Sequence, residues 1–186
     1  MIDKKKIERA AASIIEAIGE DPRREGLVDT PRRIAAMYGE FLDSGDQEPS
    51  EVLATGFEEG HGEMIVLKDI PFYSICEHHF LPFYGTAAVG YLPNGRVVGV
   101  SKLARALDIL ARRLQLQERL TTQLADAIEE ALRPEGVGVI ISAEHMCMSI
   151  RGVKKLGSKL VTSASRGIIK TEEAARREFD RMLREI

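Results

Sequence analysis

The chain has 186 residues, of which 44% are hydrophobic and 30% charged, and its formal net charge is −3. This composition is typical of a folded globular protein and excludes an intrinsically disordered chain. Its apolar runs are too short to cross a bilayer, and residues 1–20 carry charge throughout, unlike a secretory signal. We therefore expect a cytoplasmic protein with no membrane partner. Two cysteines are too few for a disulfide scaffold.

The charge is divided unevenly along the chain. Residues 1–60 hold 8 Lys and Arg against 14 Asp and Glu, a balance of −6, whereas residues 61–186 hold 18 against 15, a balance of +3. A nucleic-acid-binding domain normally presents a basic face or stripe, and neither is visible here. We expect no nucleic-acid partner, although a local anion site in the second part stays open.

The first part of the chain is predicted to be helical. Apolar residues recur at helical spacing over residues 4–18. A second helix is expected to start with Thr30 as its N-cap and Pro31 in its first turn. Residues 43–62 are acidic and rich in Gly, Ser and Pro, which indicates a long connection. We therefore divide the chain into a helical region at 1–61 and a second domain at 62–186.

The second part alternates between strand and helix patterns. The Pro93-Asn94-Gly95 segment predicts a hairpin between its flanking strands, and Ser101 is expected to cap the helix that follows. The expected elements are, in order, strands at 64–72, 85–93 and 96–100, helices at 101–114 and 117–132, strands at 136–150 and 159–169, and a final helix opening at 171–173. Hairpins joined by a helix pair predict an α+β fold, in which the pair packs on one face of an antiparallel sheet.

The cysteines and histidines cluster in two short segments. Cys76 and His79 have a spacing that lets one loop supply two metal ligands, and Cys147 could add a third. Thiolate and imidazole donors favour zinc, and three protein ligands with one open position are typical of catalytic zinc. Such a site produces hydroxide near neutral pH. His78 and His145 would then serve as proton-transfer groups beside the metal.

Two plainer interpretations of this cluster stay open. Cys76 and Cys147 could be ordinary buried thiols. Alternatively, His78 or His145 could complete a closed structural zinc site with four protein ligands. His61, in a glycine-flanked loop, is expected to be solvated.

Two helix starts carry polar groups that could bind a substrate. Ser101, Lys102 and Arg105 lie at the start of the predicted helix 101–114, where free backbone N–H groups and cations favour phosphate. They could equally form a solvated helix face. At the start of the next helix, Glu118 could accept two N–H donors from a guanine-type ring edge, or it could simply favour the helix dipole.

Together with further segments of the chain, these motifs resemble those of the GTP cyclohydrolase I family, and the resemblance covers about residues 22–182. The motifs are, in order, Cys76-Glu77-His78-His79-Phe80-Leu81-Pro82-Phe83, Gly90-Tyr91-Leu92-Pro93-Asn94, Ser101-Lys102-Leu103-Ala104-Arg105, Gln117-Glu118-Arg119-Leu120-Thr121, His145-Met146-Cys147-Met148, Arg151-Gly152-Val153 and Ser158-Lys159-Leu160-Val161-Thr162-Ser163. The chain departs from the family at residues 164–166, where apolar residues are more usual. No proposed site residue is affected.

The resemblance implies a tunnelling fold (T-fold) for residues 62–186, with the N-terminal helices added. It implies conversion of GTP and water to 7,8-dihydroneopterin triphosphate and formate, the first step of tetrahydrofolate and pterin biosynthesis. It also implies a homodecamer of two face-to-face pentamers, with active sites at subunit interfaces.

Residue roles carried over from the family are specific. The resemblance implies Zn²⁺ ligands at Cys76, His79 and Cys147, acid/base residues at His78 and His145, a guanine anchor at Gln117 and Glu118, and triphosphate contacts at Ser101, Lys102, Arg105 and Arg151. Two rivals to this function remain. One is another T-fold enzyme acting on a pterin or deazapurine, and the other is a non-catalytic, zinc-stabilised oligomeric module.

Overall fold

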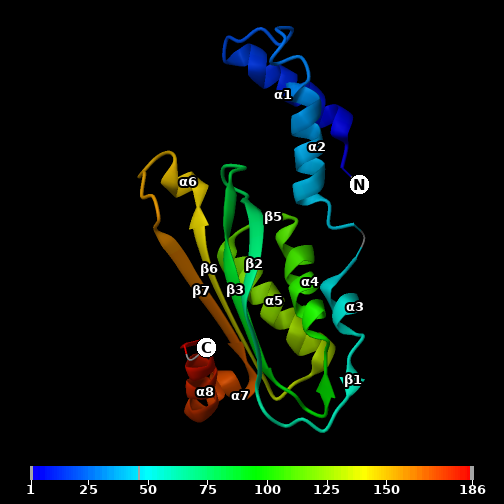
Figure 1. Cartoon of the computed structure of the whole chain (residues 1–186), viewed down its shortest axis with the longest axis vertical. Coiled ribbons are helices and arrows are strands. Elements are labelled where there is room, and N and C mark those ends of the chain that lie inside the picture. The colour runs from blue at the N-terminus through cyan, green and yellow to red at the C-terminus, as the bar shows by residue number, and fades with distance from the viewer. Residues whose placement is uncertain (1, 46, 185–186) are drawn as a thin grey trace. The chain divides into compact units, whose positions relative to one another are not determined.

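The computed structural model describes residues 2–45 and 47–184. The chain forms two compact units, Met1–Gly45 and Asp46–Ile186 (Figure 1). Within the described residues, no helix has both the length and the apolar character needed to cross a membrane.

The first unit is a pair of helices, α1 (Lys4–Ala17) and α2 (Thr30–Leu42). Its buried apolar side chains include Ala11, Ile15, Pro31 and Ala35. Both helices were expected, but the N-cap of α2 is Asp29 rather than Thr30. The carbonyl of Asp29 accepts the first helical bond, from the N–H of Arg33, so Thr30 already lies inside the helix.

The segment predicted as a long connection, residues 43–62, contains two elements. They are α3 (Pro49–Leu53) and β1 (Phe57–Glu58). A reciprocal capping box between Glu48 and Glu51 starts α3. The helix forms because Leu53 is fully buried in the core of the second unit, a tertiary contact that the polar composition conceals.

A mixed five-stranded sheet forms the centre of the second unit, in the order β5-β2-β3-β6-β7. The strands are β2 (Ile65–Cys76), β3 (Pro82–Leu92), β5 (Leu114–Gln115), β6 (Gly136–His145) and β7 (Lys159–Arg166). The pairs β2–β3, β3–β6 and β6–β7 are antiparallel, whereas β2 and β5 are parallel. The α+β class is thus confirmed, with a parallel edge strand added to the antiparallel sheet.

The hairpin predicted around Asn94-Gly95 is wrong. Gly95 does turn the chain, with a positive φ of 74°. However, β3 pairs with β2 and β6, while β4 (Arg96–Val97) pairs with β1. The turn signal describes local backbone geometry, and the partner of each strand is decided by the rest of the sheet.

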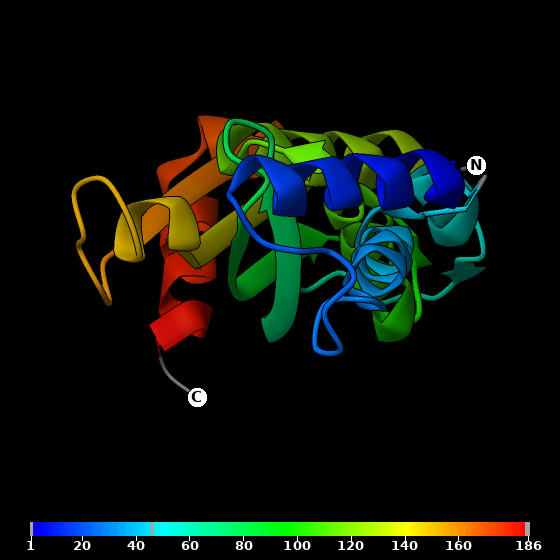
Figure 2. The ribbon, with the colours of Figure 1, turned by 90° about the horizontal axis from the view of Figure 1, so that it is seen from above.

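Helices cover both faces of the sheet (Figures 1 and 2). The helices α4 (Val100–Ala111) and α5 (Gln117–Leu132) pack their apolar sides on one face, in the main core. On the other face lie α7 (Gly167–Thr171) and α8 (Glu173–Arg184). There the ring of Phe179 sits over the paired residues Gly90 and Gly138, where an added Cβ would lie 2.5 and 2.7 Å from ring carbons.

Several element boundaries differ from the sequence predictions: the strands predicted at 64–72, 85–93 and 96–100 are β2, β3 and β4, and the helix predicted at 101–114 ends at Ala111. The N-cap of α4 is Gly99, whose carbonyl accepts from the N–H of Lys102, so Ser101 lies in the first turn and is not the cap. The strand predicted at 136–150 ends at His145 and is followed by α6 (Met146–Ser149). The strand predicted at 159–169 ends before Gly167, whose positive φ of 55° turns the chain into α7.

Candidate active site

Three side chains that could hold a metal ion meet where β2 and β6 end and β3 begins. Cys76 is the last residue of β2, and a tight turn leads back into β3. In this turn the N–H of Phe80 donates to the carbonyl of Cys76 over 2.9 Å, which brings His79 back toward that cysteine. Cys147 lies in α6, directly after β6. Because Phe83 pairs with His145 in the sheet, the turn and α6 lie at the same end of the strands.

One donor atom each from Cys76, His79 and Cys147 lies within 4.8 Å of the others. Bonds of about 2.3 Å to sulfur and about 2.0 Å to nitrogen would place zinc among donors so spaced. Cys76 is buried, Cys147 is partly buried and His79 is exposed, so the cluster is open toward solvent on the His79 side. The donor set and its spacing therefore fit a metal ion with an accessible position.

The two cysteines are free thiols close enough to influence each other. Burial raises the pKa of the Cys147 thiol, and the neighbouring Cys76 raises it further, while the nearby Arg151 acts in the opposite direction. A metal ion bound between thiols reverses this effect, because it stabilises both thiolates. The arrangement is therefore well suited to a cation.

His145 is held on two sides. Its ring stacks on that of Phe83, with 4.6 Å between centroids and 3° between planes. Its Nε2 lies 2.9 Å from Oε1 of Gln117. Burial lowers the pKa of His145, and the negative charge of Glu118 partly offsets this effect. The start of α5 is thus electrostatically coupled to this histidine.

The side chain of Gln117 is almost completely buried, at 1% exposure. Its Nε2 lies 3.0 Å from each of three acceptors, the carbonyls of Ile141 and Leu160 and the hydroxyl of Thr162. Both ends of the amide are therefore engaged inside the chain. Glu118, the next residue, is exposed and available to a ligand.

Two more residues from the sequence analysis border the cluster. His78 is exposed, and its ring meets that of His79 edge-on, with 6.3 Å between centroids. Arg151 Nη1 lies 2.7 Å from Nε2 of His79. The structure therefore places both residues beside the metal-binding group.

The remaining polar residues from the sequence analysis lie elsewhere. Ser101, Lys102 and Arg105 occupy the first turns of α4, whereas its last turn leads into β5, beside Cys76. A helix rises about 1.5 Å per residue, so about 15 Å separates the two ends of α4. Ser101 and Lys102 therefore lie toward the end of α4 that is distant from Cys76, with Arg105 between the two ends.

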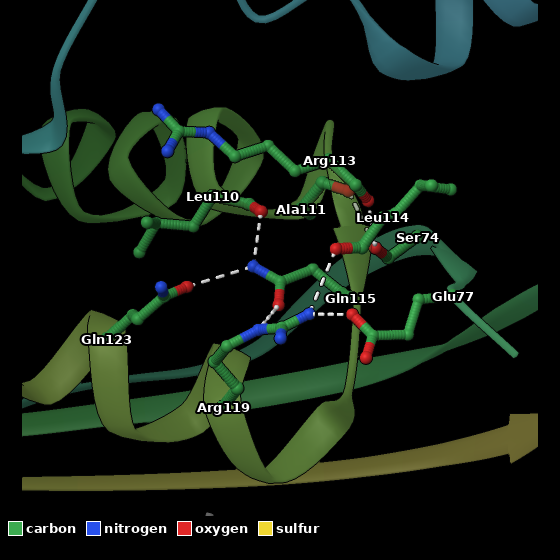
Figure 3. A network of polar contacts seen from close by, with 9 residues as sticks. All are labelled: Ser74, Glu77, Leu110, Ala111, Arg113, Leu114, Gln115, Arg119 and Gln123. Atoms are coloured by element: carbon green, nitrogen blue, oxygen red, sulfur yellow. Dashed lines mark hydrogen bonds and ion pairs between the residues drawn. The ribbon is translucent and has the colours of Figure 1, made fainter.

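Sequence reasoning gave no role to three side chains beside the cluster. Glu77, Gln115 and Arg119 form one connected polar network (Figure 3). Glu77 lies inside the metal-binding motif, but its partners are more than thirty positions away. No spacing rule in the sequence links them.

Comparison with known proteins identifies the family. A family model described as GTP cyclohydrolase I matches residues 7–184. A GTP cyclohydrolase 1 of Carboxydothermus hydrogenoformans is 61% identical over 179 residues, covering 96% of this chain and 93% of that protein. One from Dehalococcoides mccartyi is 56% identical and covers 96% of both chains. One from Streptococcus thermophilus is 52% identical over the full length of both. The chain belongs to the GTP cyclohydrolase I family.

Proposed function

We propose that this protein converts GTP and water to 7,8-dihydroneopterin triphosphate and formate, the first step of tetrahydrofolate and pterin biosynthesis. Membership of the family supports the reaction. The structural observation that carries it is the convergence of Cys76, His79 and Cys147, with donor atoms within 4.8 Å of one another. Two free thiols at the site agree with an enzyme working in the reducing cytoplasm.

Zinc is the metal that these residues suit best. Two thiolates and one imidazole are typical zinc donors, and three protein ligands leave a position for water. When bound, zinc supplies a water molecule of lowered pKa and thereby a nucleophile at neutral pH. Cys76, His79 and Cys147 would hold it.

The hydrogen bonds around Gln117 assign the proton positions on His145. The amide nitrogen of Gln117 must donate to the carbonyls of Ile141 and Leu160, since carbonyls only accept. Its Oε1 therefore accepts from Nε2 of His145. The lone pair of the neutral ring is then on Nδ1, which can take up a proton. We propose His145 as an acid/base residue in the later steps. For Gln117, implied by the resemblance to be part of the guanine anchor, we propose instead the role of orienting His145, because its amide is engaged within the chain.

His78 is proposed as the acid that protonates N7 of guanine during ring opening. It is exposed beside His79, so an incoming base can reach it. Glu118 is proposed to accept the N–H donors of the guanine edge, because its carboxylate is exposed at the start of α5 and acts electrostatically on His145.

The triphosphate is proposed to be bound by Ser101, Lys102 and Arg105 together with Arg151. Arg151 lies against His79, whereas Ser101 and Lys102 lie in the first turn of α4 and Arg105 near its middle. We propose that a second copy of the chain supplies them, so that the active sites lie at subunit interfaces. We propose that residues 62–186 adopt the T-fold and that the subunits assemble into a decamer of two face-to-face pentamers.

Release of formate from GTP tests the proposal directly. The purified protein is expected to carry zinc and to release one formate per GTP consumed. Cys147→Ser is expected to lose both zinc and turnover, whereas Met148→Leu, at the exposed neighbouring position in α6, keeps both. Zinc binding without formate release would favour the non-catalytic module. Near-stoichiometric zinc in Cys147→Ser would refute its assignment as a ligand.

A further inference from the structure

The turn that carries His78 and His79 rests on the connection between α4 and α5. The strand β5 pairs in parallel with the end of β2, placing Cys76 opposite Gln115. Just beyond, the N–H of Glu77 donates to the carbonyl of Gln115 over 3.1 Å. The first half of the metal-binding turn is therefore fixed to β5 through the backbone.

Gln115 extends this link through its side chain, which is only 2% exposed. Its Nε2 donates to the carbonyl of Leu110 and to Oε1 of Gln123, both over 2.9 Å. These two bonds fix the amide orientation, because a carbonyl can only accept. Oε1 of Gln115 is therefore directed at Arg119, whose Nε donates to it over 3.0 Å (Figure 3).

Arg119 connects this buried amide to the metal-binding turn. Its Nη2 donates to the carbonyl of Leu114 over 3.1 Å and also to the carboxylate of Glu77. Three acceptors on three different residues thus hold one guanidinium, whose planar donors are arranged for such bridging. Figure 3 shows the guanidinium between Gln115 and Glu77.

Glu77 lies within the turn that carries the proposed metal ligands Cys76 and His79. It lies between Cys76 and the two exposed histidines. The turn also contains Phe80 at a positive φ of 56°, a conformation that non-glycine residues adopt reluctantly. A contact on the Glu77 side chain therefore restrains a segment that is otherwise solvent-facing.

We propose that Arg119 and Glu77 are positioning residues for the metal site. Through Gln115 and Leu114, Arg119 fixes the turn against β5, in the conformation in which His79 can share a metal ion with Cys76 and Cys147. Since Arg119 follows Glu118 in α5, the same contact fixes the metal-binding turn relative to the proposed guanine anchor. This inference rests on the proposed metal site.

An isolated, half-exposed ion pair would have little effect, so the alternative is a surface salt bridge without influence on the metal. Arg166 provides the matched control. It also pairs with carboxylates of α5, Asp126 and Glu129, but it lies at the end of β7 that pairs with the start of β6, away from His145.

The test is zinc affinity, measured by chelator competition on the full-length protein. Loss of a group bonded directly to a metal ligand typically weakens binding about 10–100-fold. Arg119 acts on the turn through Glu77, next to Cys76, so Arg119→Ala is expected to weaken zinc binding by about 10-fold, the lower end of that range. Glu77→Gln is nearly isosteric and leaves Arg119 its bonds to Gln115 and Leu114, so it tests the ion pair with little risk to folding. Arg119→Lys is expected to restore part of the affinity, and Arg166→Ala to keep it.

A second readout separates positioning from general stability. The absorption spectrum of the Co²⁺-substituted protein reports ligand geometry, and we expect it to change in Arg119→Ala and Glu77→Gln but not in Arg166→Ala. The double variant Glu77→Gln/Arg119→Ala is expected to be no worse than Arg119→Ala, because both remove one contact. Unchanged zinc affinity and Co²⁺ spectrum in Glu77→Gln and Arg119→Ala would overturn this inference. If the wild-type protein bound no zinc, the proposed metal site itself would fail.

Discussion

At the residue scale, the two proposed proton-transfer groups have contrasting surroundings. His145 is stacked on Phe83 and fixed by Gln117, and burial lowers its pKa. His78 is exposed on the turn beside His79. One histidine is therefore held in a defined orientation, while the other is free to meet the substrate. This difference fits two proton transfers at separate stages of the reaction.

Replacing either histidine should separate catalysis from metal binding. His78→Ala and His145→Ala are each expected to keep zinc and to lose about 10²-fold or more in turnover, because each removes a proton-transfer group without removing a metal ligand. Formate release and metal content are measured on the same samples. His61→Ala, in an exposed loop, is the control and should retain activity. A metal-free His78→Ala or His145→Ala would reassign that residue as a ligand.

Glu118 should determine base recognition. Hydrogen bonds to a charged group are strong, so Glu118→Gln is expected to weaken GTP binding by about 10–100-fold while zinc content stays unchanged. Adenine lacks the donor edge of guanine, so ATP should not be a substrate. Calorimetric titration of GTP measures the effect, with Glu130→Gln on the same helix as the control. Wild-type affinity in Glu118→Gln would leave only the helix-dipole role.

The sequence could predict part of this site because Cys76 and His79 are neighbours in one turn. Residues three positions apart stay close in space whatever the fold, so this local pattern was enough to indicate a metal site. The bonds of Gln117 to Ile141, Leu160 and Thr162 depend on the order of β6 and β7 beside α5. No local pattern contains that order. For the same reason, the sequence could not predict that Glu77 pairs with Arg119, which is distant along the chain.

At the element scale, helices were easier to predict than strand partners. The bounds of α5 agree with the predicted helix at 117–132, because its apolar stripe repeats within the segment itself. Strand pairing is decided between distant segments, and the hairpin expected around Asn94-Gly95 was wrong for that reason. The polar segment that contains α3 has two buried residues, Pro49 and Leu53, and Leu53 packs in the main core.

The contact of α8 with the sheet provides a test of packing. An Ala at Gly138 would place its Cβ 2.7 Å from the Phe179 ring, and the backbone there needs no positive φ. We expect Gly138→Ala to lower the free energy of unfolding by about 1–3 kcal/mol through overpacking. Thermal or urea unfolding measures the change.

Two further variants identify the cause. Gly60→Ala, where an added Cβ meets no atom within 4 Å, should be nearly neutral. In a Phe179→Leu background the cost of Gly138→Ala should shrink, because the ring that causes the overlap is gone. An equal cost in both backgrounds would show that the ring is not the cause.

At the scale of the whole molecule, the proposed site residues are spread along α4 and beyond its C-terminal end. The metal-binding group lies beside β5, after the last turn of the helix, whereas Ser101, Lys102 and Arg105 lie in its first turns. About 15 Å of helix separates Ser101 from the end of α4 that adjoins Cys76, and in the proposed assembly a second copy of the chain is a further source of phosphate-binding residues. The separation makes assembly part of the proposed mechanism.

Mixed oligomers test this division. A Lys102→Ala/Arg105→Ala chain and a His145→Ala chain are each expected to be nearly inactive alone. Co-expressed in equal amounts, they should recover about a quarter of wild-type turnover. In random assembly, about a quarter of the interfaces combine a chain with intact Lys102 and Arg105 (the phosphate half of a site) and a neighbour with intact His145 (its metal half). The control pairs His145→Ala with a chain carrying all three substitutions; no metal half is intact there, so no activity should return. Failure of the first pair to regain activity, in oligomers shown to contain both chains, would place the whole site within a single chain.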